Sequence, residues 1–303
     1  MTGAMTAWID AITGTPEGAR IASLLAVSAA FLHALFGALQ KGRHDPWISR
    51  AAIDLCYGLM ALPVVLFVVP WPEPALWPVL AGAMVIHIGY KLSQAQTYTR
   101  GAYTVVYPVV RGSAPLFAVL AAGAVFGEQF TATQWGGVML LVAAIFGLAA
   151  FNLRRLTVGR DTLVPALGWA VVTGAGVALY TTYDAWGIRQ AINPFTFLAW
   201  FFLLDSIFMP VLRWRQLAAM RGNDALALAG RGIIGALVAF ASFGSIMLAT
   251  RIDDVGRAAV LRETSTVFAA LVGWLILGEK VGPWRTALMA LIALGALIVE
   301  FGA

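Results

Sequence analysis

Ten apolar stretches, each long enough to cross a bilayer as a helix, constrain this sequence more than any other feature. About 20 helical residues span the hydrocarbon core of a membrane. The candidate segments lie at 21–40, 51–70, 75–97, 102–125, 132–151, 164–187, 195–213, 230–250, 255–277 and 283–302. Because they are continuously apolar, without the alternation of barrel strands, they favour helices. The sequence therefore predicts an all-α integral membrane protein.

The low content of charged residues excludes an ordinary soluble domain. Only 12% of the 303 residues are charged and 60% are hydrophobic, whereas a soluble domain is about 25% charged. The longest polar connection, around 213–231, is too short to hold a domain.

The first twenty residues, with Asp10 and Glu17, lack the basic start and apolar core of a cleavable signal. The net charge of +5 comes from basic residues in short loops, so no nucleic-acid partner is expected.

The sequence repeats itself at an offset of 151 residues. Nine of the 35 positions from 94 to 128 are identical to their counterparts. The matches are Thr99, Arg100, Val109, Arg111, Phe117, Ala118, Leu120, Gly127 and Glu128 with Thr250, Arg251, Val260, Arg262, Phe268, Ala269, Leu271, Gly278 and Glu279. Nearer the front of each half, Asp45-Pro46 matches Asn193-Pro194. A shared apolar composition would not align two arginines and a Gly-Glu pair.

The duplication divides the chain into two halves of five helices. We predict an N-terminal segment at 1–20, a first repeat at 21–151, a basic connecting loop at 152–163 and a second repeat at 164–303. Since five is an odd number, the second half enters the membrane with the opposite orientation. Two inverted five-helix repeats around a central cavity are the arrangement in which secondary transporters bind substrate near the midplane. A monomer would suffice for such a pathway, and a homodimer is compatible with it.

The basic residues between the predicted segments indicate the orientation of the chain. One side receives Lys41, Arg43, Arg50, Arg100, Arg154, Arg155, Arg160, Arg213, Arg215, Arg221, Arg231, Lys280 and Arg285, and the other receives Arg20, Arg189, Arg251 and Arg257. Cytoplasmic loops carry the excess of lysine and arginine. We therefore expect a multi-pass protein of the inner (plasma) membrane, surrounded by lipid, with both termini outside.

Ionisable residues inside the predicted spans are the candidates for function, because each costs about 2.5–3.5 kcal/mol at the bilayer centre on insertion scales. The most distinctive are the matched arginines, Arg111 and Arg262. They can line the central cavity and hold a carboxylate or phosphate. Alternatively they satisfy helix-terminal carbonyls, snorkel to an interface, or pair with Asp184, Asp205 or Glu263. Helical spacing places Tyr107 on the face of Arg111, and Pro115 weakens the helix beside it.

A second polar face runs along the third segment through His87, Lys91 and Gln94. Lys91 is expected to contact substrate or, equally, to pair with Asp54 or Asp184. Asp184 follows Tyr180 by one turn, and a carboxyl group shielded from water can exchange a proton during transport. Glu263 is the competing proton carrier. Because adjacent helical residues point about 100° apart, Arg262 and Glu263 should each have a partner on another helix.

Two motifs stand at equivalent places in the halves. The first is Tyr107-Pro108-Val109-Val110-Arg111-Gly112, followed by an apolar run into Phe126-Gly127-Glu128. The second is Leu261-Arg262-Glu263-Thr264-Ser265, running into Leu277-Gly278-Glu279-Lys280. Both resemble the corresponding stretches of EamA-type members of the drug/metabolite transporter superfamily. The resemblance implies ten helices in two inverted repeats around a central cavity, and transport of small metabolites, frequently export. It also implies a structural role for the Gly127–Glu128 and Gly278–Glu279 pairs, in tight turns into the fifth and tenth helices.

The sequence lacks motifs for nucleotide binding, a zinc site or a nucleophile elbow. We therefore expect no catalytic residue, metal or cofactor, and predict a secondary transporter, an exporter or exchanger, of a small polar, anionic or zwitterionic metabolite. The substrate would be bound by Arg111, Arg262, Lys91, Gln94 and Tyr107. Either Glu263 or Asp184 would couple proton movement to transport. The alternatives are a non-transport membrane protein, such as a lipid-modifying enzyme, or a lipid-linked carrier flippase on the same fold.

Overall fold

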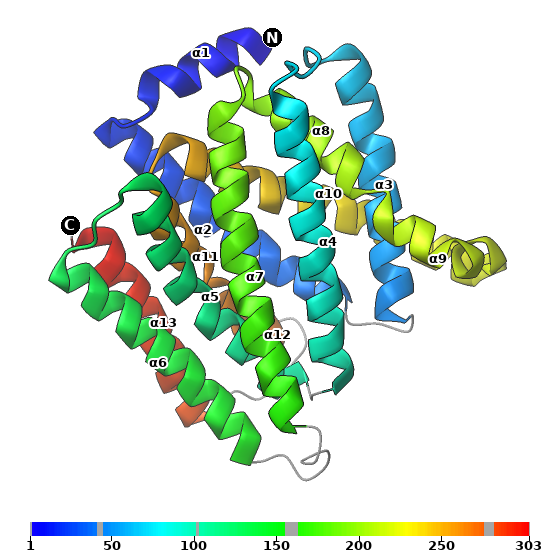
Figure 1. Cartoon of the computed structure of the whole chain (residues 1–303). Coiled ribbons are helices and arrows are strands. Elements are labelled where there is room, and N and C mark those ends of the chain that lie inside the picture. The colour runs from blue at the N-terminus through cyan, green and yellow to red at the C-terminus, as the bar shows by residue number, and fades with distance from the viewer. Residues whose placement is uncertain (1, 41–44, 101–102, 155–162, 276–281, 303) are drawn as a thin grey trace. The chain divides into compact units, whose positions relative to one another are not determined.

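The computed structural model describes residues 2–40, 45–100, 103–154, 163–275 and 282–302, and within these ranges every regular element is a helix (Figure 1). The helices are α1 (Thr2–Ile12), α2 (Pro16–Gln40), α3 (Pro46–Phe67), α4 (Leu76–Arg100), α5 (Tyr103–Phe126), α6 (Ala132–Arg154), α7 (Leu163–Gln190), α8 (Pro194–Asp205), α9 (Phe208–Ala219), α10 (Gly222–Ile252), α11 (Val255–Arg262), α12 (Ser265–Leu275) and α13 (Pro283–Phe301). The prediction of an all-α membrane fold is confirmed.

Nine helical segments among the described residues are long and apolar enough to cross a membrane. They correspond to nine of the ten predicted spans. The remaining span, 255–277, consists of the short helices α11 and α12, and its last two residues lie outside the described ranges. The interruption between these two helices falls immediately after Arg262.

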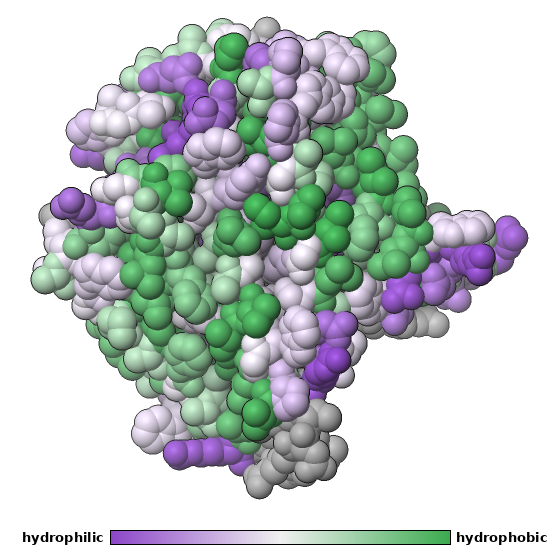
Figure 2. Space-filling model, viewed as in Figure 1, coloured by the Kyte–Doolittle hydropathy of each residue, from purple (hydrophilic) through white to green (hydrophobic). Residues whose placement is uncertain are grey.

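The polar connection predicted around 213–231 is mostly helical. α9 continues to Ala219, with a kink at Arg213, and α10 begins at Gly222. At 31 residues, α10 is roughly 46 Å long and exceeds the thickness of the hydrocarbon core, so charged residues at its start can remain helical outside the lipid. Figure 2 shows hydrophilic side chains gathered at this end of α9 and α10.

The repeated Asp-Pro and Asn-Pro pairs begin equivalent helices in the two halves. The Asp45 carboxylate accepts hydrogen bonds from the first free amides of α3, and the Asn193 side chain does the same for α8. Each proline occupies a first-turn position, where its missing N–H is not needed. The two matching dipeptides are therefore the start signals of α3 and α8.

The described helices form two compact units, each assembled from both halves of the sequence. Unit 1 comprises residues 1–84 and 186–253, and unit 2 comprises residues 85–185 and 254–303. α4 and α7 contribute to both units. The two sequence repeats therefore do not coincide with the two compact units.

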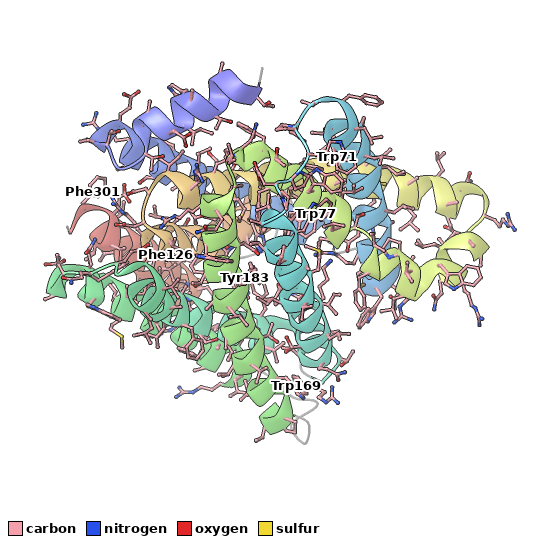
Figure 3. The ribbon with its side chains drawn as sticks, turned by 45° about the horizontal axis from the view of Figure 1, so that its top comes forward. Trp71, Trp77, Phe126, Trp169, Tyr183 and Phe301 are labelled. Atoms are coloured by element: carbon pink, nitrogen blue, oxygen red, sulfur yellow. The ribbon has the colours of Figure 1, made fainter. Side chains whose placement is uncertain are left out.

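Unit 1 is built around α2, α3, α8 and α10. α2 packs along α10, and α3 packs against α8 and α10. The Phe202 ring stacks on Phe240 with centroids 3.9 Å apart. Trp71 and Trp77, which lie close together in Figure 3, both contact the Trp200 ring. These aromatic contacts hold α8 against its neighbours.

Unit 2 is built around α5, α6, α11 and α13. The helices α6 and α13 run side by side (green and red in Figure 1) and approach closely at Gly137 and Gly295. A Cβ atom on either glycine would come within 2.7 Å of the other's carbonyl oxygen. Glycine is therefore required at this crossing, as is common where membrane helices pack closely. α5 packs against both α6 and α11, and this places the two matched arginines in one unit.

Candidate substrate and proton site

Unit 2 brings together most of the predicted site residues. The participating helices are α4, α5, α7 and the α11–α12 pair. Six ionisable side chains of this group are each at most 7% exposed: His87, Lys91, Arg111, Asp184, Arg262 and Glu263. Burial of so many ionisable groups is costly unless each is paired or serves a ligand.

Arg111 is paired with an acid on the equivalent helix of the second half. Its Nε lies 3.0 Å from Oε2 of Glu263, and its Nη2 donates to Oγ of Ser265 at 2.7 Å. The Tyr107 ring centroid lies 5.9 Å from the guanidinium carbon. The pairing alternative for Arg111 is therefore the one that the structure contains, and it ties α5 to the start of α12.

The first half has no acid at the position equivalent to Glu263 that could pair with Arg262 in return. The counterpart of Glu263 is Gly112, and a Cβ on this glycine would come within 3.1 Å of the Ile145 side chain on α6. The tight packing of α6 therefore leaves little room for a larger residue at this position. The two repeats therefore differ here, because position 263 carries an acid and its counterpart, position 112, carries a glycine.

Arg262 has a different environment from its counterpart. It is 6% exposed, its Nη2 donates to Oγ1 of Thr181 at 3.3 Å, and its guanidinium carbon lies 5.9 Å from the Tyr180 ring centroid. Within the described ranges no carboxylate forms an ion pair with it. Its Nε and the hydroxyl of Thr266, four residues on, have no hydrogen-bond partner among the described residues. Arg262 is thus a buried cation with unused hydrogen-bonding capacity.

The backbone changes character between α11 and α12. The amides of Glu263, Thr264 and Thr266 each donate to the carbonyl three residues earlier, at 3.0–3.1 Å. This spacing is that of a 3₁₀ turn, which is tighter than an α-helix and often marks a hinge within a long helix. The sequence predicted a weakened helix at Pro115 instead, yet α5 continues through Pro108 and Pro115.

A second pair links α4 to α7. Nε2 of His87 lies 2.7 Å from Oδ2 of Asp184, and both side chains are buried. The Tyr180 ring packs against His87 and Tyr90, with centroids 4.7 and 4.9 Å away. Gln94 donates to the Tyr90 hydroxyl at 2.6 Å. Tyr180 therefore contacts the His87 side of the cluster as well as Arg262.

Lys91 lies one turn after His87 and is 7% exposed. Of the two acids proposed as its partners, Asp184 also contacts His87, and Asp54 contacts Arg50 in unit 1. Asp205, which the sequence offered as a partner for the matched arginines, lies in unit 1 and accepts a hydrogen bond from Tyr57. Asp54 and Asp205 thus belong to unit 1, whereas the matched arginines belong to unit 2.

The first Gly-Glu pair lies at the end of α5. Gly127 has a φ of +72°, a conformation that favours glycine after a helix. The Glu128 carboxylate accepts hydrogen bonds from the Val255 and Gly256 amides at 2.7 and 2.8 Å. Glu128 thus caps the start of α11, a contact with the other half that the sequence did not predict. Gly278 and Glu279 lie outside the described residues.

Sequence reasoning missed several partners in the cluster. Ser265, Thr181 and Tyr90 are polar residues of kinds that occur throughout membrane helices, and nothing in their spacing distinguishes them. The pairing of His87 with Asp184 joins positions 97 residues apart, although each residue was visible as an ionisable group in an apolar segment. No group of three or more potential metal-binding His, Cys, Asp or Glu side chains occurs in the part of the chain that the structure describes.

Together, the helical spans and the buried ionisable cluster define a multi-pass α-helical membrane protein with a polar interior. The sequence model of the EamA-like transporter family matches residues 20–150 and again residues 164–301. The chain therefore belongs to the EamA-like transporter family, and it is a membrane transporter.

Two further similarities agree with this assignment. The chain is 28% identical over 135 residues, which are 43% of its length and 93% of its relative's, to an "Uncharacterized transporter in cobO 3'region" of Sinorhizobium sp.. A solved crystal structure of a protein that is 19% identical superposes on 93% of this chain and 99% of its own, with a TM-score of 0.76. This second similarity concerns the fold alone.

Proposed function

We propose that the chain is a secondary active transporter that moves a small anionic or zwitterionic metabolite by alternating access. The single observation that carries this proposal is the environment of Arg262. Arg262 is 6% exposed and, unlike Arg111, forms no ion pair with a carboxylate among the described residues, so its guanidinium is suited to an anionic group. Arginine holds carboxylates and phosphates through two parallel N–H donors.

The contrast with Arg111 supports the assignment. Arg111 already has the Glu263 carboxylate and the Ser265 hydroxyl, so its main role is to join α5 to α12. Arg262 has one long hydrogen bond and an aromatic neighbour. In this proposal Arg262 binds the anion, while Lys91, Gln94 and Tyr107 contact the rest of the substrate.

The 3₁₀ turn after Arg262 is suited to alternating access. Irregular backbone within a membrane span is typical of transporter substrate sites, where part of a helix moves during the cycle. A change at this turn would move Arg262 relative to Glu263 and Arg111. The substrate gradient, exchange or proton movement would supply the energy. Export or exchange is the expected mode, in the inner (plasma) membrane with both termini outside.

The alternatives are separated by what the site contacts. A lipid-modifying enzyme should gather a nucleophile or metal ligands at one membrane face, whereas the cluster is dispersed over four helical segments and centres on arginine. A lipid-linked carrier flippase would bind its anionic headgroup through the same cation, but its cargo would partition into lipid. We propose a small water-soluble substrate, bound by a monomer in a lipid bilayer, with a homodimer not required.

The proposal is tested by ligand-dependent thermal stabilisation of the purified protein. A panel of carboxylates, amino acids and phosphate esters is compared with neutral sugars, using wild type, R262Q and R262K. We expect at least one anion or zwitterion to stabilise wild type, R262K to retain part of the shift, and R262Q to lose it. Stabilisation by neutral compounds alone, or equal stabilisation of R262Q, would exclude Arg262 as the binding group.

A further inference from the structure

We propose that His87 and Asp184 together form the proton-carrying pair of this transporter, and that Tyr180 connects this pair to Arg262. The inference rests on the proposed function for the anion but adds the proton site and the sign of its coupling. It starts from two observations in unit 2, the 2.7 Å contact between the imidazole and the carboxylate and the position of the Tyr180 ring beside both groups.

The His87–Asp184 pair can change its charge without leaving a buried ion alone. In the deprotonated pair, Nε2–H of a neutral His87 donates to the Asp184 carboxylate, and the net charge is −1. One proton, added at Nδ1 of His87 or on the carboxyl group, brings the net charge to zero. Such a pair titrates as a unit. Water on the open side would supply the proton and, after the conformational change, water on the other side would receive it.

Glu263 is less suited to this role. Its carboxylate is 1% exposed and lies 3.0 Å from Arg111, which remains charged throughout the physiological range. Protonating Glu263 would therefore leave a buried guanidinium without its counter-ion, which is strongly destabilising. The His87 imidazole can itself be neutral or charged, so the His87–Asp184 contact persists in both protonation states. The structure thus favours one of the two acids that the sequence left open.

Tyr180 brings the proton pair and the anion-binding cation within electrostatic range. The ring centroids of His87 and Tyr180 are 4.7 Å apart, and the guanidinium carbon of Arg262 lies 5.9 Å from the centroid of Tyr180. These two distances set an upper limit of about 10.6 Å between the imidazole centroid and the guanidinium carbon. Little bulk water separates groups that share a buried ring, so the interaction is only weakly screened.

The other charged and titratable groups of the cluster come from the helices of the site. α4 contributes Lys91 and Tyr90, α7 contributes Tyr180 and Tyr183, α5 contributes Tyr107 and Arg111, and the α11–α12 segment contributes Arg262 and Glu263. Arg111 and Glu263 compensate each other as an ion pair. Lys91 and Arg262 are then the fixed positive charges that favour the deprotonated pair.

The sign of the coupling follows from these charges. An anion on Arg262 neutralises the cation that opposes protonation of the pair, and a proton on the pair removes the negative charge that opposes the anion. A unit charge about 10 Å away changes an equilibrium roughly tenfold at an effective dielectric constant near 20. The proton and the anion therefore bind together and cross the membrane in the same direction, whichever gradient drives them.

The test requires no substrate, so its outcome is independent of whether the binding assignment is right. The carboxyl and imidazole infrared bands of the reconstituted full-length protein are titrated with pH. D184N and H87Q assign the bands of the pair, and D54N, which removes a buried acid of unit 1, is the matched control. The titration is then repeated in R262Q and in R262K, with thermal unfolding recorded for every variant.

We expect one titration that D184N and H87Q both abolish or displace and that D54N leaves in place. Removing the cation in R262Q should favour protonation and raise the midpoint by about one pH unit, while R262K keeps it near that of wild type. Should R262Q prove unstable, R262M removes the charge and keeps the apolar stem. The proposal is overturned if no band assigned to His87 or Asp184 titrates while the protein is folded, or if the midpoint is the same with and without the positive charge at 262.

Discussion

Replacing Arg111 with glutamine should destabilise the protein far more than the same replacement at Arg262. R111Q leaves the Glu263 carboxylate, 1% exposed, without the guanidinium that now lies 3.0 Å away, and it removes the donor of the 2.7 Å bond to Ser265. Removing one partner of a buried ion pair costs about 3–5 kcal/mol. At roughly 2–4 °C per kcal/mol, the melting temperature should fall by about 6–20 °C.

R262Q removes much less. The lost contacts are a 3.3 Å hydrogen bond to Thr181 and a cation–π contact with Tyr180, together worth about 1–2 kcal/mol. This loss is offset because a buried charge with no described carboxylate partner also disappears. The net change in the free energy of unfolding should therefore lie within about 1 kcal/mol of zero.

Both variants are compared with wild type by thermal and denaturant unfolding in detergent micelles. The double variant R111Q/E263Q completes a mutant cycle, and it should recover much of the stability that R111Q loses, because neither residue then remains as an unpaired buried charge. The account of the two arginines would be refuted if R262Q destabilised the protein as much as R111Q, or if the double variant were no more stable than R111Q.

Two other contacts give predictions that can be measured in the same way. E128Q keeps one acceptor oxygen but loses the charged cap on the first amides of α11. It should lower the free energy of unfolding by about 1–2 kcal/mol. An unchanged free energy of unfolding would show that the cap does not stabilise the protein. Y57F removes the donor to the buried Asp205 carboxylate in unit 1 and should lower the free energy of unfolding by about 1–3 kcal/mol. Ligand-dependent stabilisation through Arg262 should persist. Loss of that stabilisation would contradict the separate roles of the Tyr57–Asp205 pair and Arg262.

The helical class and most of the spans could be predicted because they depend on local composition. An apolar run of about 20 residues can satisfy its backbone in lipid only as a helix or a closed barrel. The exceptions are instructive. The start of α10 lies outside the predicted spans, in the polar connection, because a helix that emerges from the membrane can carry charged residues in water. The interruption after Arg262 has no proline or glycine to signal it.

The candidate site could be predicted residue by residue but not as a set of contacts. Ionisable residues in apolar segments are rare, so Arg111, Glu263 and Asp184 were visible from the sequence. Their partners depend on which helices cross and at what height, and this information is not local. The repeat suggested equal roles for the two arginines, whereas one Gly-to-Glu difference gives Arg111 an acid and leaves Arg262 for another anion.

The most direct test of the central claim is transport by Arg262 variants in proteoliposomes. The radiolabelled probe is the first anion or zwitterion that stabilises wild type in the thermal screen, and its uptake is measured by counterflow with wild type, R262K, R262Q and Y57F. We predict saturable counterflow in wild type and Y57F, a weaker affinity in R262K, and no counterflow above that of empty vesicles in folded R262Q. Counterflow by R262Q with the affinity of wild type would contradict the claim that this buried arginine binds the substrate.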